Sequence, residues 1–270
     1  MRRPLKDILK RHVPAEVRDT ARRFQQLAKL PFMLGNKFCC PCCEWQFNRL
    51  LSFYGRDGVR CPYCNSLPRQ RFQAWLLSEG LGLNLSEVSI LHFAPEFSLS
   101  KYLKRKTTRR YTRADALISF IPGVCVRPDI VADIRSLRLA AGSSDLVICN
   151  HVLEHVREDA CALAELSRVL SDGGLALVTV PISDVSDTTL EDLSIDTPQL
   201  RDRHYGSPDH VRLYGMDIVD RFRAAGFDVE IRRPRDWLPA GKIEEWSLDE
   251  AEPHFILSKG ALPEFPGKGR

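Results

Sequence analysis

The sequence lacks a long apolar run, and no segment approaches the roughly 20 residues that a helix needs to cross a bilayer. The N-terminal stretch MRRPLKDILKRH also lacks the continuous apolar segment of a secretory signal. We therefore expect a cytoplasmic protein. A chain of 270 residues with 44% hydrophobic residues can bury a sizeable core, and its length suits one large domain with a smaller module.

The excess of positive over negative charge is also small. A net charge of +4 is too low to imply nucleic-acid binding for the chain as a whole, but the basic residues are unevenly distributed. Between Met1 and Lys37, ten Lys and Arg residues face three acids. Residues 1–37 also carry a loose helical stripe of apolar side chains, which predicts a basic helical arm. Such an arm packs on its own domain, or it contacts an acidic membrane surface or RNA, and the sequence leaves these alternatives open.

Internal repeats and low-complexity segments are absent, and few cysteines lie outside one cluster. Six of the nine cysteines fall between Cys39 and Cys64, which in a reducing compartment indicates a metal site rather than disulfides. The segments CPCC and CPYC provide two C-x2-C pairs, and four thiolates close a tetrahedral structural zinc site. An overlapping pair ending at Cys42 competes with the first, but we prefer the choice in which both pairs read C-P-x-C. The predicted zinc ligands, in a zinc-ribbon-like module over residues 38–70, are Cys40, Cys43, Cys61 and Cys64.

From Ser86 onward, short apolar segments alternate with helical patterns. The strand candidates are VSILHFA, RYTRADA, GVCVRPDIV, SDLVICN and GLALVTVP, and the segment EDACALAELSRVL has helical spacing. Nearly continuous apolar strands that are separated by helices predict a parallel sheet covered on both faces. The predicted fold class is therefore α/β, a doubly wound, Rossmann-like domain that follows the helical arm and the zinc-ribbon-like module.

Glycine is missing where nucleotide-binding folds usually carry a glycine-rich turn, because ILHFAPEFSLSKYL runs from a strand into a helix without one. Acids nevertheless follow the next strands. Asp115 ends the second strand about 20 residues on, the separation expected of an acid that binds a ribose, and Asp133 ends a third. Asn150 and His151 close the fourth strand. A single Asp after a strand is usually a turn or cap residue, but this ordered recurrence indicates a ligand crevice at one sheet edge.

The segment DLVICNHVLEHVREDACALAELSRVLSDGGLALVTVP resembles the fourth strand, helix and fifth strand of class I S-adenosylmethionine (SAM) dependent methyltransferases of the type 11 kind. Together with LHFAPE, YTRADA, DHVRLYGMDIVDRFRAAGFDVE and the preceding CPYCNSLPRQR, it is similar to a bacterial subgroup with a zinc-ribbon-like segment before the methyltransferase domain. The resemblance covers roughly residues 38–258. It implies a SAM-dependent methyltransferase domain over residues 71–260, with a tail at 261–270.

The resemblance also implies where SAM would bind. Ala94 and Glu96 occupy glycine positions of the usual D-x-G-x-G loop, and His92 replaces its acid. Because SAM has no pyrophosphate, a close approach of backbone amides to phosphate is not required, and such a degenerate loop stays compatible with binding. Glu96 faces the amino-acid end of SAM or caps the next helix. The implied contacts to the rest of SAM are the ribose at Asp115, the adenine at Asp133 and Ile134, and the methionine side at Asn150 and His151.

The segment HVLEH, His151 to His155, satisfies H-x-x-E-H, the pattern of inverted zinc proteases. A protease needs both histidines on one helix, whereas His151 is predicted to close a strand and His155 to lie in the following helix. We therefore interpret Glu154 as a carboxylate near the helix dipole and His155 as an anchor of the strand-to-helix turn.

Methyl transfer to a hydroxyl needs an aligned nucleophile and a group that takes its proton. Candidates lie in the polar insertion at residues 184–214, which is expected to cover the site at the carboxyl edge of the sheet. His210 is the first candidate base, with Asp209 to orient it, and His204 is the second. The alternative is that each histidine only holds its own loop. Arg212 is expected to bind an anionic acceptor or to pair with Asp209.

The sequence thus predicts SAM-dependent methyl transfer to an unidentified acceptor, a small-molecule or glycan hydroxyl. Two alternatives stay open. One is an RNA methyltransferase that uses the zinc module and the basic arm, and the other is a catalytically silent binding module, which the missing glycines suggest. The acids at successive strand ends favour the enzyme, because a silent scaffold has no physical need for them.

Overall fold

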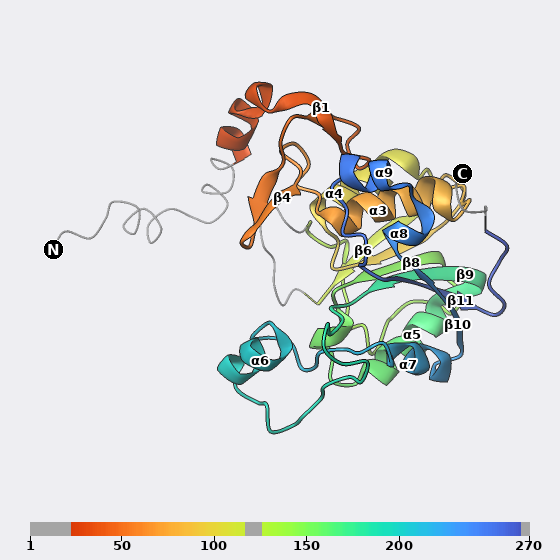
Figure 1. Ribbon diagram of the computed structural model, residues 1–270. Helices are drawn as coiled ribbons and strands as arrows, with labels where there is room; N and C mark the ends of the chain where they lie inside the picture. The colour runs from red at the N-terminus through yellow and green to blue at the C-terminus, as the bar shows by residue number, and fades with distance from the viewer. Residues whose placement is uncertain (1–22, 117–125, 266–270) are drawn as a thin grey trace.

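The computed structural model describes residues 23–116 and 126–265, and its centre is a seven-stranded sheet of order β10-β11-β9-β8-β5-β6-β7 (Figure 1). Strands β5 to β9 run parallel to their neighbours among themselves, whereas β11 is antiparallel to both β9 and β10. In chain order the strands are β5 (Ile90–Phe93), β6 (Tyr111–Asp115), β7 (Ile130–Val131), β8 (Ser144–Asn150), β9 (Leu170–Thr179), β10 (Phe227–Arg232) and β11 (His254–Lys259).

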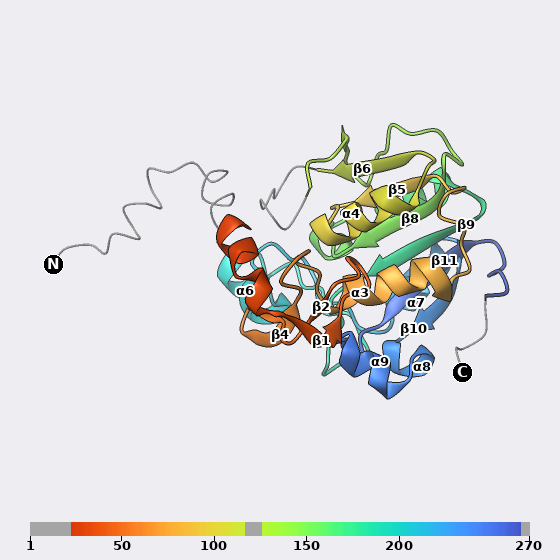
Figure 2. The same cartoon turned by 90° about the horizontal axis from the view of Figure 1, so that it is seen from above.

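Helices cover both faces of this sheet, with α3 and α4 on one side and α5 and α7 on the other (Figures 1 and 2). The predicted doubly wound α/β fold is therefore confirmed. Within the two described ranges, no helix is long and apolar enough to cross a bilayer. The helical elements that follow the cysteine segment are α3 (Pro68–Trp75), the π-helical turn η2 (Leu76–Gly80), α4 (Phe97–Lys106), η3 (Leu153–His155), α5 (Asp159–Val169), α6 (Pro198–Tyr205), α7 (Ile218–Ala224), α8 (Pro234–Trp237) and α9 (Ala240–Glu245).

The central strands are apolar on both faces because neighbouring side chains of a strand point in opposite directions. In β5, Ile90 belongs to the core beneath α3 and α4, and Leu91 belongs to the core beneath α5 and α7. In β8, Leu146 and Val147 are divided between the same two cores. This double burial explains why these strands read as continuous apolar runs instead of alternating with polar residues.

The cysteine segment folds as two small antiparallel hairpins that pack directly on the larger domain. The first consists of β1 (Leu34–Cys39) and β2 (Gln46–Phe47), and the second of β3 (Leu51–Phe53) and β4 (Arg56–Arg60). The cysteines share one apolar core with side chains of α3 and α4. The domain boundary that we expected at residue 70 therefore falls inside α3, since this helix belongs to both parts.

The predicted helical arm ends earlier than expected. Residues 23–28 are helical, and the short helix η1 (Leu30–Phe32) follows. Residues 34–37, which we expected in the arm, lie in β1 instead, because this segment pairs with β2 and Phe47 of β2 is fully buried. Other predicted segments lie outside the described residues, namely 1–22 of the arm, 123–125 of the third strand candidate and 266–270 of the tail.

A buried arginine joins the cysteine segment to the C-terminal part of the chain. Arg71 of α3 is fully buried and donates to the carbonyls of Ser66 at 2.8 Å and Val59 at 3.0 Å. It also donates to the carbonyls of Trp246 at 2.5 Å and Ser247 at 2.7 Å. One guanidinium therefore satisfies four carbonyls from two segments that are far apart in sequence.

Replacing Arg71 with Ala should lower the free energy of unfolding by about 3 kcal/mol, because four carbonyls lose a charged donor. Chemical denaturation monitored by circular dichroism would measure the change. Arg223→Ala is the matched control, since Arg223 is 64% exposed and pairs with exposed Asp220, and it should cost less than about 0.5 kcal/mol. Equal effects of the two substitutions would contradict the structural role of Arg71.

Candidate functional site

The carboxyl ends of β5 and β8 meet where the winding of the chain reverses, because β6 and β7 extend the sheet on one side and β9 extends it on the other. Open α/β sheets bind their ligands at such a switch point. Ala94 and His151 directly follow these two strands, and both have left-handed backbones, with φ of 45° and 50°. Residues other than glycine rarely adopt this conformation, and such strain concentrates at functional sites. Ala94 thus has the backbone conformation of a glycine at a position where the resemblance implies one.

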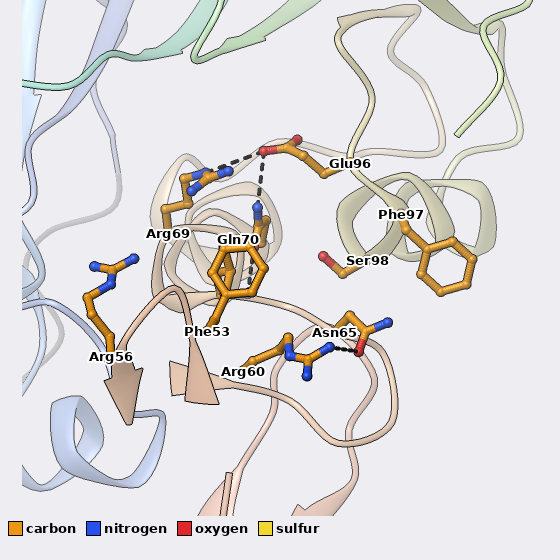
Figure 3. Close-up of a pocket in the computed structure, with 10 residues that line it drawn as sticks. Phe53, Arg56, Arg60, Asn65, Arg69, Gln70, Glu96, Phe97 and Ser98 are labelled. Carbon is orange, nitrogen blue, oxygen red and sulfur yellow. Dashed lines mark hydrogen bonds and ion pairs between the residues drawn. The ribbon is translucent and has the colours of Figure 1, made fainter. Parts of the chain in front are cut away.

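Glu96 lies at the centre of a buried polar network at this edge (Figure 3). One carboxylate oxygen accepts from Gln70 Nε2 at 3.1 Å and from Arg69 Nε at 3.4 Å. The other lies 3.2 Å from His92 Nε2 and 3.3 Å from Asn150 Nδ2. Glu96 precedes α4, yet its side chain makes no capping hydrogen bond. Of the two roles considered for Glu96, capping of α4 is therefore wrong, and the carboxylate faces the switch point.

The pKa of Glu96 reflects two opposing effects. Burial alone would raise it, but the hydrogen bond with His92 and the charge of Arg69 outweigh burial and hold the pKa at about 2. The other ring nitrogen of His92 lies 2.9 Å from the Tyr111 hydroxyl, and His92 is fully buried. The His92 ring therefore positions Glu96 and has no exposed surface to offer a ligand.

Asn150, at the end of β8, is tied to α3. Its side-chain amide exchanges two hydrogen bonds with the amide of Gln73, at 2.8 and 2.9 Å, and accepts a third from the Thr179 hydroxyl at 2.9 Å. Both Asn150 and Gln73 are buried. Asn150 thus lies at the predicted edge, but its amide groups are already occupied by the protein.

The side chains predicted to bind the nucleoside part of SAM lie at the ends of β6 and β7. The Asp115 carboxylate is half-buried and accepts no hydrogen bond from any described residue. Asp133 is bound by Arg135, with nitrogen-to-oxygen distances of 2.7 to 3.1 Å, and Arg135 also contacts Glu158. Ile134 is buried in the core beneath α5 and α7. Of these residues, Asp115 is the one whose polar atoms remain available.

A cavity of about 130 Å³ lies between the β3–β4 hairpin and the starts of α3 and α4 (Figure 3). Arg56, Arg60 and Arg69 line it together with Glu96 and the ring of Phe97. The Nε of Arg60 is buried and has no hydrogen-bond partner among the described residues, and burial lowers the pKa of this guanidinium. Guanidinium groups bind carboxylates and phosphates, while Glu96 suits a cation, so the cavity matches a small group that carries both charges.

The four predicted metal ligands come together in the cysteine segment. The sulfurs of Cys40 and Cys64 are 3.6 Å apart, those of Cys43 and Cys61 are 3.7 Å apart, and all four residues are buried. A tetrahedral zinc shell with bonds of about 2.3 Å places its sulfurs roughly 3.8 Å apart, so the arrangement fits this ion. The competing Cys42 donates its thiol to the Gln70 carbonyl at 3.2 Å and is not in the group.

A second cluster, formed by Glu154, His155 and His210, lies beside His151 at the end of β8. His210 Nδ1 is 2.9 Å from the Tyr205 carbonyl, and its Nε2 faces Glu154 Oε1 at 4.0 Å. The rings of His155 and His210 pack edge to face, with their centroids 4.8 Å apart. Glu154 is 1% exposed and faces these histidines, not the N-terminus of α5, which begins at Asp159. Glu154 lies in the first turn of the short helix η3, so its expected interaction with a helix dipole stays a prediction.

Two predictions for the insertion also need correction. Asp209 does not orient His210, because its carboxylate accepts from Ser207 at 2.5 Å and approaches His155 Nδ1 at 3.4 Å, and the Tyr205 carbonyl holds His210 instead.

Neither predicted role of Arg212 holds. This side chain is buried, pairs with Glu191 at 2.5 Å and Asp159 at 3.5 Å, and so ties the insertion to the domain. His204 lies exposed on α6, outside the cluster of Glu154, His155 and His210.

Sequence reasoning missed Arg69, Gln70 and Gln73, because it treated the PRQR segment as the end of the zinc module. A signal was present: three long polar side chains on the first turns of a helix directly after the last cysteine pair. Their function depends on where α3 packs, which the local pattern does not state.

Comparison with known proteins identifies part of this region. Residues 95–178 match the sequence model of a family described as "Methyltransferase domain". No curated protein matches the chain.

Several solved structures have a similar fold. One is a chain of the complex between the Haloferax volcanii Trm112 methyltransferase activator and a methyltransferase. Its sequence is 12% identical, the match covers 73% of this chain and 91% of that chain, and the TM-score is 0.49. The SAM-dependent methyltransferase from Mesorhizobium loti shows 13% identity, coverage of 65% and 92%, and a TM-score of 0.45. The Burkholderia thailandensis 1,6-didemethyltoxoflavin-N1-methyltransferase shows 14% identity, coverage of 70% and 75%, and a TM-score of 0.43. At these identities the similarity extends to the fold alone.

The buried network predicts a specific acid response. Because the folded pKa of Glu96 is about 2, below its ordinary value of 4.5, the ionised side chain stabilises the fold above about pH 4.5, and this contribution is lost as the pH falls toward 2. Glu96→Gln should therefore lower the free energy of unfolding by about 2 kcal/mol at pH 7 and by much less near pH 2.

Urea denaturation from pH 7 to pH 2 would measure the difference between the wild type and this variant. Glu87→Gln, at an exposed position, serves as the control and should track the wild type throughout. A Glu96→Gln difference that stays constant over this pH range would contradict the assignment.

Proposed function

We propose that this chain is a SAM-dependent methyltransferase that transfers a methyl group to a hydroxyl of a small-molecule or glycan acceptor. The observation that carries the proposal is the location of the matched segment. Residues 95–178 contain the turn after β5 from Pro95 onward and all of β8, which together border the switch point. The methyltransferase match therefore coincides with the edge of the sheet where Glu96, Asp115 and Asn150 lie.

SAM supplies a methyl group on a positively charged sulfur, and the residues at the switch point suit its different parts. The Asp115 carboxylate, which accepts no hydrogen bond from the described part of the chain, can accept hydrogen bonds from both ribose hydroxyls. Asp133 and Ile134 at the next strand end are proposed for the adenine. Glu96 suits the ammonium group of the amino-acid end, and Arg60 and Arg69 suit its carboxylate. This assignment keeps opposite charges together in the cavity between the cysteine segment and α4.

The acceptor is proposed to lie between this edge and the insertion that contains α6. A hydroxyl acceptor must lose a proton, and we assign this task to His210 with its neighbours Glu154 and His155. A neutral His210 that donates Nδ1–H to a carbonyl keeps a lone pair on Nε2, which is the state a general base requires. Glu154 would stabilise the imidazolium that forms.

The four cysteines are proposed to hold one structural zinc ion. Four thiolates leave no open coordination position, so the ion would serve folding rather than catalysis. Its effect would reach the switch point, because Gln70 and Gln73 lie on the helix that begins four residues after Cys64.

The cofactor assignment predicts that the wild type binds both SAM and its demethylated product, S-adenosylhomocysteine. Asp115→Ala should weaken SAM binding by about 10- to 100-fold, since it removes a charged acceptor of two hydrogen bonds. Isothermal titration would measure both proteins. Asp172→Ala is the control, because Asp172 is 97% exposed and lies near the amino end of β9, opposite the carboxyl edge of the sheet.

Absence of SAM binding to the wild type at millimolar concentration would reject the proposed function. SAM binding without any methyl transfer, tested with labelled SAM and cell extract, would instead favour the catalytically silent module.

The zinc assignment predicts a difference between neighbouring cysteines. Cys43→Ser should lose zinc and lower the melting temperature, because a structural zinc contributes directly to folding. Cys39→Ser, the matched control at a half-exposed position outside the group, should retain zinc. Elemental analysis and thermal melting would check both variants, and zinc retained by Cys43→Ser at full occupancy would refute the ligand set.

A further inference from the structure

The cluster of Glu154, His155 and His210 has the composition of a second metal site, separate from the four cysteines. One ligand atom from each of the three side chains lies within 4.8 Å of the others. A glutamate and two histidines offer one oxygen and two nitrogens, a combination typical of zinc and neighbouring divalent transition metals.

Glu154 is the strongest indication. Its side chain is 1% exposed, and both carboxylate oxygens are buried without a hydrogen-bond donor among the described residues. His151 Nδ1 lies 3.2 Å from Oε1 in an ion-pair contact. A buried carboxylate that accepts no hydrogen bond is costly unless a positive charge compensates it. In contrast, Glu96 at the same edge has a donor or ring nitrogen at each oxygen, whereas Glu154 has a ring nitrogen within hydrogen-bond distance at Oε1 alone among the described residues.

The hydrogen bonds of His210 and His155 leave one nitrogen of each ring available to bind a cation. A carbonyl can only accept a hydrogen bond, so the contact of His210 Nδ1 with the Tyr205 carbonyl fixes the proton on Nδ1 and leaves the lone pair of Nε2 facing Glu154. Metal-binding histidines usually donate their other ring nitrogen to a carbonyl or carboxylate in this way. His155 has a similar outer partner, because its Nδ1 lies 3.3 Å from the carbonyl and 3.4 Å from the carboxylate of Asp209.

We propose that Glu154, His155 and His210 bind a divalent transition-metal cation at the carboxyl edge of β8. Metal bonds of about 2.0 Å place ligand atoms roughly 3.4 Å apart, so the 4.0 Å between His210 Nε2 and Glu154 Oε1 needs to shorten by less than about 1 Å. Three protein ligands leave at least one coordination position open. Because the three residues come from η3 and from the insertion, the ion would also fasten the insertion to the sheet.

The catalytic consequence rests on the proposed function, whereas metal binding itself does not. With the ion bound, the metal would take over the role assigned above to metal-free His210, because His210 Nε2 would then be a ligand and could not accept a proton. The cation would instead lower the pKa of an acceptor hydroxyl placed in its open position, which then releases its proton to solvent. The acceptor class is thereby narrowed to hydroxyl compounds that can coordinate a metal.

Titration of the zinc-loaded full-length protein with CoCl2 tests the site. The wild type should bind one further equivalent of cobalt, with visible absorption of a nitrogen- and oxygen-ligated ion and without the near-ultraviolet thiolate charge-transfer band that cobalt at the four cysteines would show. Glu154→Gln and His210→Ala should each weaken this equivalent by at least about 100-fold, because each removes a direct ligand. His204→Ala removes an exposed histidine from the same insertion and should bind like the wild type.

The cysteine-bound zinc and the thermal melt report whether each variant is folded. If Glu154→Gln fails to fold, His210→Ala decides, since His210 lies on the insertion rather than in the core. No additional equivalent in the wild type, or an unchanged equivalent in a folded His210→Ala, would overturn the proposal. These outcomes are independent of SAM titration, so failure of the metal site and failure of the proposed function are distinguishable.

Discussion

The amide pair between Gln73 and Asn150 is the interaction on which the arrangement of the site depends. It joins the helix that follows the cysteine segment to the last residue of β8, with two hydrogen bonds in a fully buried position. Either amide alone would leave buried polar groups unsatisfied, so the pair fixes the position of α3 over the switch point. Everything else that α3 brings to this edge, including Arg69 and Gln70, follows from that position.

The same packing explains how the turn after β5 functions without glycine. In a glycine-rich turn, backbone amides approach a ligand because no side chains intervene. Here the turn carries Glu96, and its carboxylate is held by side chains from α3, β5 and β8. Ala94 still takes the left-handed conformation, and the small side chain limits the cost. The edge thus offers side-chain charge where related folds offer backbone dipoles.

Sequence patterns predicted the parts of this protein that depend on local or repeated features. Apolar runs located β5, β8 and the main part of β9 because both faces of these strands are buried, and C-x2-C spacing selected the four cysteines because each pair closes a short turn. The patterns failed where the partner is distant in sequence. Arg71 bonds to carbonyls 175 and 176 residues away, and Gln73 bonds to a residue 77 positions away. Arg212 was expected to bind an anionic acceptor or Asp209, and only the packed insertion shows that it is buried and pairs with Glu191 and Asp159.

The order of the strands has a consequence for how the chain reaches its native state during synthesis. β11 comes last in the sequence yet lies between β9 and β10, so β10 cannot join the sheet until residues 254–259 have left the ribosome. The carbonyls of Trp246 and Ser247, which accept hydrogen bonds from Arg71, are also synthesised late. The first and the last segments of the described chain are therefore completed together, and a nascent chain with its cysteine hairpins already formed still exposes the edge of β9. The native sheet of this protein is therefore completed only when its C-terminal strand β11 is available.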